Sequence, residues 1–297
     1  MTVQQRKALD ELLRGGPLDV GGEIAEQRAI FHEMIASVPL PEDVSAKRGE
    51  LGGVPVVTVQ TPDIDQAAVI LYFHGGAYAL GSAPDSVGLA ADLVRRAGAR
   101  AISVDYRLAP EHPFPAAVDD AVAAYRALLD EGVPAAHIAF VGESAGGGLV
   151  AATLVALKDA GLAQPASAAV FSPWADLTVS GASATTKAAL DPALTPEALR
   201  TRARDYLGDR DPAAPLASPA FADLTGLPPL LIQAGSHEIL LDDAVRLAAR
   251  AAEHDVPVEL QVWPGVPHVF QGFAALLDEA DEALNAAAAF LKRHWAD

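Results

Sequence analysis

The chain has 297 residues, and its 39 Asp and Glu outnumber its 21 Lys and Arg, which leaves a formal net charge of -18. It contains no Cys, which excludes disulfides, thiolate nucleophiles and Cys-bound metals. The acidic balance argues against a nucleic-acid or anionic-membrane partner, because both require a basic surface. With 51% hydrophobic and 20% charged residues, the composition is typical of a globular chain of one large or two small domains.

The first sixteen residues do not resemble a targeting segment. They carry charges where a secretory signal would need an apolar core. No window approaches the roughly 18 uncharged apolar residues that a membrane-spanning helix requires. We therefore expect a soluble, cytoplasmic protein.

Two stretches in the chain are predicted to be helical and to lie outside the central sheet. Residues 1–45 contain amphipathic patterns at 3–13 and 24–35, and residues 175–228 have short helical patterns with Asp-Pro punctuation at Asp191-Pro192 and Asp211-Pro212. An insertion as long as the second stretch usually covers something.

The rest of the chain alternates apolar runs with helical patterns. The predicted strands are residues 54–60, 67–73, 101–106, 138–142, 167–171, 230–234 and 258–263, and the predicted helices are 87–97, 117–129, 147–160, 242–253 and 273–293. Several runs are apolar without interruption, as expected for central strands covered on both faces. The alternation predicts an α/β fold with a mostly parallel sheet flanked by helices, whose active crevice lies at the carboxyl ends of the strands.

The pentapeptide Gly142-Glu143-Ser144-Ala145-Gly146 matches G-x-S-x-G and sits between a predicted strand and a helical run. A sharp strand-to-helix turn needs small residues two positions before and after its centre and exposes the central Ser. We therefore predict that Ser144 is a nucleophile rather than a simple helix cap, with the amide of Ala145 directed into the site.

The loop His74-Gly75-Gly76-Ala77 follows another buried strand. Acyl transfer builds negative charge on a carbonyl oxygen, and preorganised backbone amides are its usual stabilisers. Two successive glycines allow amides to turn toward such an oxygen without interference from a Cβ atom. Together with the nucleophile motif, this loop predicts an oxyanion hole.

A Ser nucleophile needs a base, normally a His held by a carboxylate. Of the eight His residues, His268 lies in a loop just after the last predicted strand, and we predict that it is the base. For the acid, Glu238 lies nearest the end of the strand at 230–234, while Asp242 and Asp243 fall where a helix begins and are better suited to capping it. We favour Glu238 and keep Asp242 as the alternative; the order Ser, acid, His is that of α/β-hydrolases.

These ordered motifs resemble those of the microbial hormone-sensitive-lipase-like carboxylesterases, bacterial esterase family IV, over most of the chain. The similarity lies in His74-Gly75-Gly76, Asp105-Tyr106-Arg107-Leu108-Ala109-Pro110-Glu111, the pentapeptide around Ser144, Ser172-Pro173-Trp174-Ala175-Asp176-Leu177 and Pro267-His268. The resemblance implies an α/β-hydrolase fold with a catalytic core at residues 46–174 and 229–297 and a helical cap from residues 1–45 and 175–228. It also implies an oxyanion hole from the amides of Gly75, Gly76 and Ala145, small hydrophobic ester substrates, no metal or other cofactor, and frequent homodimers.

The chain departs from the family pattern at three positions. Ala77 replaces the third glycine of the loop. The family motif that usually reads Asp-Pro-Leu-x-Asp is here Glu238-Ile239-Leu240-Leu241-Asp242. Glu143 stands where Asp is commoner; we expect it to tie the serine turn to neighbouring loops and assign it no catalytic role. Asp105 and Arg107 are expected to form a buried pair that braces the loops.

The residues therefore predict a serine carboxylesterase that hydrolyses short- to medium-chain esters through an acyl-serine intermediate. A lactonase or an amidase could use the same triad. A non-catalytic receptor on this fold is the alternative from another class, but such a protein usually gives up a triad member, whereas this chain retains Ser, an acid and His.

Overall fold

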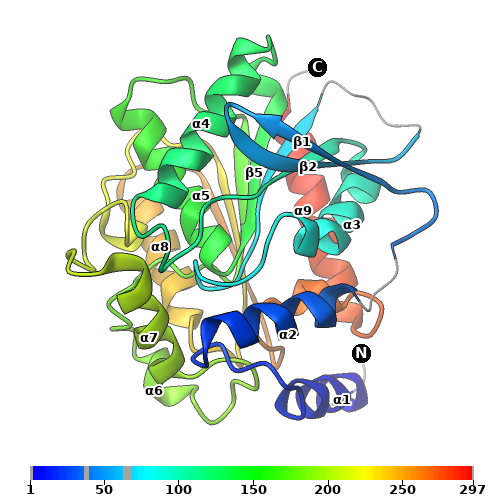
Figure 1. The fold of residues 1–297 in the computed structure, drawn as a ribbon, viewed down its shortest axis with the longest axis vertical. Helices are drawn as coiled ribbons and strands as arrows, with labels where there is room; N and C mark the ends of the chain where they lie inside the picture. The colour runs from blue at the N-terminus through cyan, green and yellow to red at the C-terminus, as the bar shows by residue number, and fades with distance from the viewer. Residues whose placement is uncertain (1–2, 37–39, 63–67, 296–297) are drawn as a thin grey trace.

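The computed structural model describes residues 3–36, 40–62 and 68–295. At the centre of this part lies an eight-stranded sheet in the order β1-β2-β4-β3-β5-β6-β7-β8 (Figure 1). The strands are β1 (Ser45–Leu51), β2 (Val54–Gln60), β3 (Val69–Phe73), β4 (Arg100–Val104), β5 (Ile138–Glu143), β6 (Ser167–Phe171), β7 (Leu230–Gly235) and β8 (Val258–Trp263). Strand β2 pairs antiparallel with both β1 and β4, and every other neighbouring pair is parallel.

Helices cover both faces of the sheet, with α4, α5 and α8 on one side and α3 and α9 on the other (Figure 1). The helices are α1 (Val3–Arg14), α2 (Ile24–Ala36), α3 (Val87–Ala97), α4 (Ala116–Asp130), α5 (Ala145–Asp159), α6 (Ser183–Thr186), α7 (Pro196–Leu207), α8 (Leu241–Glu253) and α9 (Asp278–His294). Short 3-10 turns are η1 (Pro84–Ser86), η2 (Ala135–His137), η3 (Pro219–Phe221) and η4 (Phe270–Phe273). The predicted α/β architecture is confirmed.

The uninterrupted apolar run of β3 follows from its position between two layers. Leu71 and Phe73 pack into the cluster that contains α4 and α5, while Ile70 and Tyr72 pack into the cluster with α3 and α9. Successive side chains of a strand point to opposite faces, so a strand covered on both sides needs apolar residues at every position. All five residues of β3 are buried.

Two differences from the predicted elements have local causes. Strand β1 was not predicted, because its sequence is largely charged and polar and it forms an exposed edge strand by pairing with β2. Helix α9 begins at Asp278, later than predicted, because the turn η4 precedes it. The strand predicted at residues 67–73 begins at Ala67, which lies outside the described residues.

Helices α1, α2, α6 and α7 lie together at one end of the sheet, at the bottom of Figure 1. Two of them contact the chain that follows β3: Arg28 of α2 donates from Nε to the carbonyl of Ala79 at 2.8 Å, and the ring of Tyr206 in α7 stacks on that of Tyr78 at 4.0 Å. These helices therefore stand over the carboxyl ends of the parallel strands, where the active crevice of such a sheet is expected.

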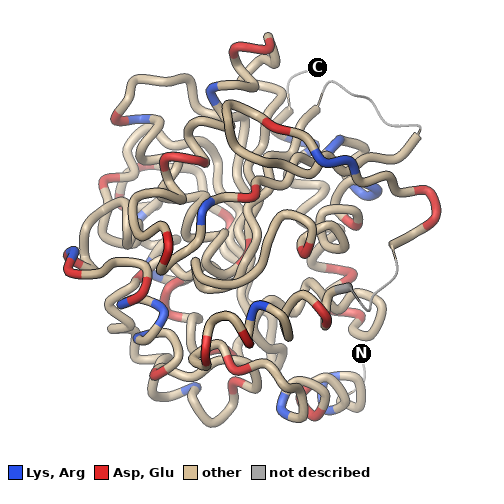
Figure 2. The backbone as a smooth tube through the Cα atoms, in the orientation of Figure 1, with Lys and Arg blue, Asp and Glu red and all other residues tan. Residues whose placement is uncertain are grey.

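Acidic residues recur along helices and loops throughout the described chain (Figure 2). The excess negative charge is thus spread over the molecule. Among the described residues, no helix is long and apolar enough to cross a membrane.

Candidate active site

The turn from β5 into α5 places Ser144 in a backbone conformation that few residues adopt, with φ 55° and ψ -122°. Its small neighbours make the turn sterically possible. A Cβ atom on Gly146 would lie 2.0 Å from the carbonyl oxygen of Phe73, and one on Gly142 would lie 2.5 Å from the carbonyl oxygen of Gly146. Because no side chain fits at either position, the glycines of the motif are required by packing.

Three side chains predicted from the sequence come together in one hydrogen-bonded row. Nε2 of His268 lies 2.9 Å from Oγ of Ser144, and Nδ1 of His268 lies 2.7 Å from Oε2 of Glu238. A carboxylate can only accept, so Nδ1 carries the proton, and Nε2 is left to accept the hydroxyl proton of Ser144. This arrangement suits a hydroxyl nucleophile with an oriented base.

Glu238 is fully buried, and both of its oxygens have partners. Besides His268, the amide of Gly235 donates to Oε1 at 2.8 Å. A buried carboxylate is stable only when it is paired and hydrogen-bonded, and these two donors meet that condition. Glu238 therefore lies at the carboxyl end of β7 in a fixed orientation toward His268.

Asp242, the alternative acid, lies on a different set of contacts. Its Oδ2 accepts the amide of Ser183 at 2.9 Å, and its own amide donates to Oγ of Ser183 at 3.0 Å. Asp242 thus joins the first turn of α8 to α6 and makes no hydrogen bond to His268 in the described structure. The geometry favours Glu238 over Asp242 as the partner of the base.

The loop that carries His268 is held by a residue that the sequence reasoning did not single out. Oγ of Ser172 accepts the amide of Val269 at 3.0 Å, and the amide of Ser172 donates to the carbonyl of Gln233 at 2.6 Å. Ser172 and Val269 both have positive φ angles, 47° and 50°. The available signal was the Ser172-Pro173-Trp174 motif directly after β6, which had been assigned no role.

The three predicted oxyanion amides are not equivalent. The amide of Gly75 donates to Oε1 of Glu143 at 2.7 Å, so it is already engaged, and this contact conflicts with its expected role. The amides of Gly76, Ala77 and Ala145 make no hydrogen bond to the described residues. Gly76 cannot be replaced, because a Cβ atom there would lie 2.1 Å from the carbonyl oxygen of Leu80.

Glu143 links the serine turn to this glycine loop. Its second carboxylate oxygen, Oε2, accepts the phenol hydroxyl of Tyr72 from β3. Burial raises the pKa of Glu143 to about 7, against the opposing effect of the hydrogen bonds from Tyr72 and Gly75. The structure therefore shows the expected link between the serine turn and a neighbouring loop.

The expected buried pair of Asp105 and Arg107 is wrong. Arg107 is exposed and binds Asp120 of α4 instead, with Nη2 at 2.7 Å from Oδ1. Asp105 accepts the amide of Ala83 at 2.8 Å. The two side chains therefore brace different segments, because each has a partner of its own, Ala83 for Asp105 and Asp120 for Arg107.

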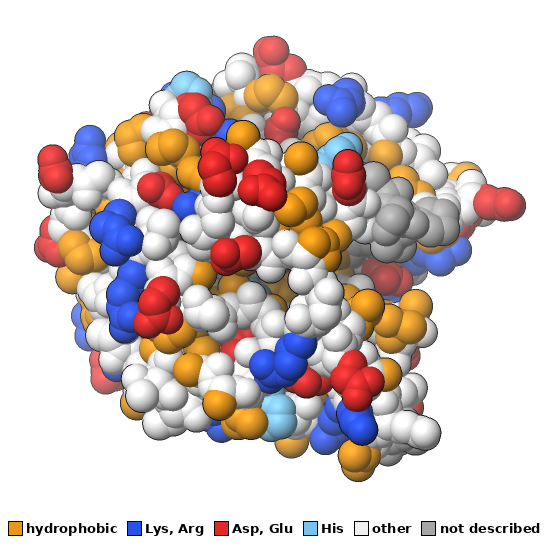
Figure 3. All heavy atoms as spheres, turned by 60° about the horizontal axis from the view of Figure 1, so that its bottom comes forward, with side chains coloured by type: hydrophobic (Ala, Val, Ile, Leu, Met, Phe, Trp, Pro, Cys, Tyr) orange, Lys and Arg blue, Asp and Glu red, His pale blue; other side chains and the backbone are white. Residues whose placement is uncertain are grey.

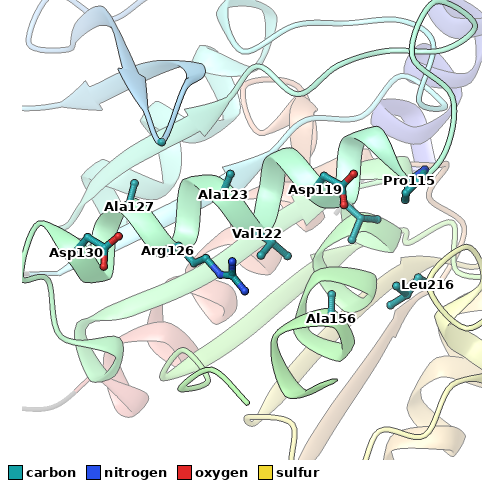
Figure 4. Close-up of a pocket in the computed structure, with 11 residues that line it drawn as sticks. Pro115, Asp119, Val122, Ala123, Arg126, Ala127, Asp130, Ala156 and Leu216 are labelled. Carbon is teal, nitrogen blue, oxygen red and sulfur yellow. The ribbon is translucent and has the colours of Figure 1, made fainter. Parts of the chain in front are cut away.

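Two hollows of the surface bear on where a ligand could bind. A groove of about 640 Å³ runs along α4 and is lined among others by Val122, Arg126 and Leu216 (Figure 4). None of the hydrogen-bonded residues Ser144, His268 and Glu238 lines this groove. The face with α1, α2, α6 and α7 is hollowed near its centre, with hydrophobic atoms inside and both acidic and basic side chains around it (Figure 3). In the described part of the chain, no group of three or more His, Asp or Glu residues is arranged to hold a metal ion.

A family model for the alpha/beta hydrolase fold matches residues 70–272, which span the glycine loop, the serine turn and His268. The chain belongs to this family. An acetyl-hydrolase of Streptomyces hygroscopicus is 47% identical over 253 residues, which cover 82% of this chain and 85% of that protein. An esterase of Acinetobacter venetianus is 40% identical over 264 residues, 89% of this chain and 87% of that protein.

Solved structures place this α/β-hydrolase more narrowly. The crystal structure of an esterase from the bacterial hormone-sensitive lipase family is 41% identical to this chain, with a TM-score of 0.95 and coverage of 100% of both chains. The resemblance to hormone-sensitive-lipase-like esterases and the α/β-hydrolase fold are therefore confirmed. The named relatives support ester hydrolysis as the reaction class.

Proposed function

We propose that this protein is a serine carboxylesterase that hydrolyses uncharged esters of short to medium chain length through an acyl-serine intermediate. The observation that carries the proposal is the hydrogen-bonded row from Ser144 through His268 to Glu238. It occurs in a chain whose named relatives are esterases and acetyl-hydrolases.

In the first step, Oγ of Ser144 attacks the carbonyl carbon of the ester while Nε2 of His268 takes the hydroxyl proton. Glu238 stabilises the resulting imidazolium through Nδ1 and holds the ring in the required tautomer. Because Glu238 is fully buried and Oε1 is occupied by the amide of Gly235, its carboxylate does not have to reorient during the reaction.

The negative charge that develops on the substrate oxygen needs amide donors that are free to receive it. We assign this role to Gly76 and Ala145, whose amides have no acceptor among the described residues. Since Glu143 occupies the amide of Gly75, we propose that Ala77 supplies the third donor in its place.

Collapse of the tetrahedral intermediate breaks the bond between the carbonyl carbon and the alcohol oxygen. The imidazolium of His268 gives its proton to that oxygen, the alcohol leaves, and the acyl group stays on Ser144. Water then attacks the acyl carbon as His268 takes one of its protons. The return of that proton to Oγ releases the carboxylic acid and restores Ser144.

For the substrate, we assign residues 1–45 and 175–228 to a cap over a core formed by residues 46–174 and 229–297. The hollow on the cap side has hydrophobic atoms inside, which favours an uncharged, hydrophobic ester (Figure 3). The name acetyl-hydrolase of one relative supports a short acyl group.

The test is hydrolysis of p-nitrophenyl esters from acetate to palmitate by the wild type and by Ser144→Ala. We expect activity to peak with acyl chains of four to eight carbons, and kcat to fall by ~10⁶-fold in the variant if the three residues act as a unit. Near-normal turnover by Ser144→Ala would contradict the serine mechanism. Faster hydrolysis of a medium-ring lactone or an anilide in a parallel assay would contradict the substrate class.

A further inference from the structure

A buried carboxylate outside the proposed triad binds the backbone next to the triad acid. Asp191 is only 4% exposed, and its Oδ2 accepts the amide of Ile239 at 2.8 Å. Ile239 directly follows Glu238 in the chain. The mechanism described above does not use Asp191, so its burial and its bond to Ile239 need another explanation.

The carbonyl of the same residue is held as well. Oγ of Ser183 donates to the carbonyl of Ile239 at 2.6 Å, and the amide of Asp242 donates to that Oγ at 3.0 Å. Both Ser183 and Asp191 belong to the long segment between β6 and β7. Hydrogen bonds from this segment therefore engage both the amide and the carbonyl of the residue that follows Glu238.

Asp191 itself is firmly fixed within its own segment. Its Oδ1 accepts the amides of Ala193 and Leu194, each at 2.9 Å. Together with Ile239, three backbone amides donate to this carboxylate. A carboxylate buried to this degree is stable only with such donors, so Asp191 ties two segments together instead of facing solvent.

This attachment matters because the reaction depends on where Glu238 lies. The side chain of Glu238 reaches His268 from a short turn between β7 and α8, and Oε2 must stay 2.7 Å from Nδ1. The β7 end of the turn is held where the amide of Gly235 donates to Oε1 of Glu238. The other end, at Ile239, is held by Ser183 and Asp191.

We propose that Asp191, assisted by Ser183, is a positioning residue that sets the orientation of Glu238 toward His268. The inference rests on the proposed function and deepens it. The segment assigned to the cap then has a second task besides covering the substrate, since it also aligns the acid that orients the base.

Asp191→Asn tests this role with almost no change in size. An amide offers one oxygen in place of two, so either Ile239 or the pair Ala193 and Leu194 must face an NH2 group. We expect kcat with p-nitrophenyl butyrate to fall on the order of 10- to 100-fold, because small displacements of catalytic groups have effects of this size. KM should change little, since no substrate contact is removed.

The matched control is Asp211→Asn. Asp211 also precedes a proline, lies in the same segment and accepts the amide two residues on, that of Ala213, at 2.9 Å. Asp211 is exposed and makes no hydrogen bond to the turn after β7 in the described structure. We expect this variant to keep wild-type kcat. Equal kinetics of the two variants, with an active wild type, would overturn the positioning role and leave the proposed esterase function intact.

A double variant separates positioning from general damage to the fold. If Asp191 acts through Glu238, adding Asp191→Asn to Glu238→Gln should lower kcat only slightly further. A loss as large as in the wild-type background would overturn the inference. If Asp191→Asn does not fold, Ser183→Ala replaces it in the same cycle, and its effect on kcat should likewise be absorbed by Glu238→Gln. A wild type without esterase activity would instead contradict the proposed function.

Discussion

Glu238 and Glu143 each bring a carboxylate close to the nucleophile, one after β7 and the other at the end of β5. Glu238 accepts from His268 and the amide of Gly235, while Glu143 accepts from Tyr72 and the amide of Gly75. Both are glutamates with two donors. Their donors differ in kind, however: one donor of Glu238 is the proposed base, whereas one donor of Glu143 is an amide of the glycine loop.

The task of a buried carboxylate is therefore set by its hydrogen-bond partners and not by its residue type. Glu238 is bonded to the proposed general base and can stabilise its positive charge. Glu143 is bonded to a phenol and a backbone amide, and burial raises its pKa to about 7. Because its two donors are Tyr72 and the amide of Gly75, and neither of them is the proposed base, Glu143 is suited to fixing the shape of the glycine loop.

Between the two glutamates, the largest expected effect is that of Glu238→Gln. The amide cannot stabilise an imidazolium as a carboxylate does and favours the wrong tautomer of His268, so kcat should fall by ~10⁴-fold. Steady-state kinetics with p-nitrophenyl butyrate measure the change. The matched control is Asp242→Asn, which should cost little activity; the opposite ranking of the two variants would move the acid role to Asp242.

Glu143→Gln should have a smaller effect on the same assay. Its single oxygen cannot accept from both Tyr72 and Gly75, so the loop shifts and the free amides lose alignment with the oxyanion. We expect kcat to fall on the order of 10- to 100-fold. Removal of a whole oxyanion donor can cost more, up to ~10³-fold. Tyr72→Phe, which removes one of the two donors, serves as the milder comparison. A loss equal to that of Glu238→Gln would mean that the two glutamates are not distinct in role.

The smallest expected effect concerns stability against pH. Glu143 has an ordinary pKa of 4.5 when unfolded and about 7 when folded, so the folded state binds more protons between these values. Its contribution to the free energy of unfolding therefore decreases as pH rises from about 4.5 to about 7 and stays low above that.

Glu143→Gln removes this titration, so the Tm of the variant relative to the wild type should be more favourable at pH 8 than at pH 5. Thermal unfolding followed by circular dichroism at both pH values measures the difference. The raised pKa of Asp243 affects both proteins equally and cancels in the comparison. A Tm difference that is independent of pH would contradict the raised pKa of Glu143.

Much of the fold could be predicted because the strands carry their own boundaries. Strands β2, β6 and β8 begin and end where the apolar runs do. Strand β1 could not be predicted in this way, since a polar edge strand is defined by its pairing with β2 and not by its own pattern. Helix α9 begins later than its sequence pattern for a similar reason. Tertiary contacts of the turn η4, and not local periodicity, decide where that helix begins.

The site shows the same division between local and long-range information. Ser144 and His268 could be proposed from motifs, and the structure brings them together. The choice between Glu238 and Asp242 depends on contacts with Ser183 and Gly235 that no spacing along the chain contains. The occupied amide of Gly75 was equally hidden, because its partner Glu143 lies 68 residues away.

The pairing of β3 with β5 has a consequence for how the site assembles during synthesis and folding. During synthesis the glycine loop and the serine turn emerge before His268. Pairing of β3 with β5 can therefore bring them together before the rest of the chain has been synthesised. The histidine that completes the row is 124 residues beyond Ser144 and follows the last strand. Recovery of activity on refolding therefore requires the loop after β8 to reach Ser144, a contact between residues 124 positions apart, and not only the pairing of β3 with β5.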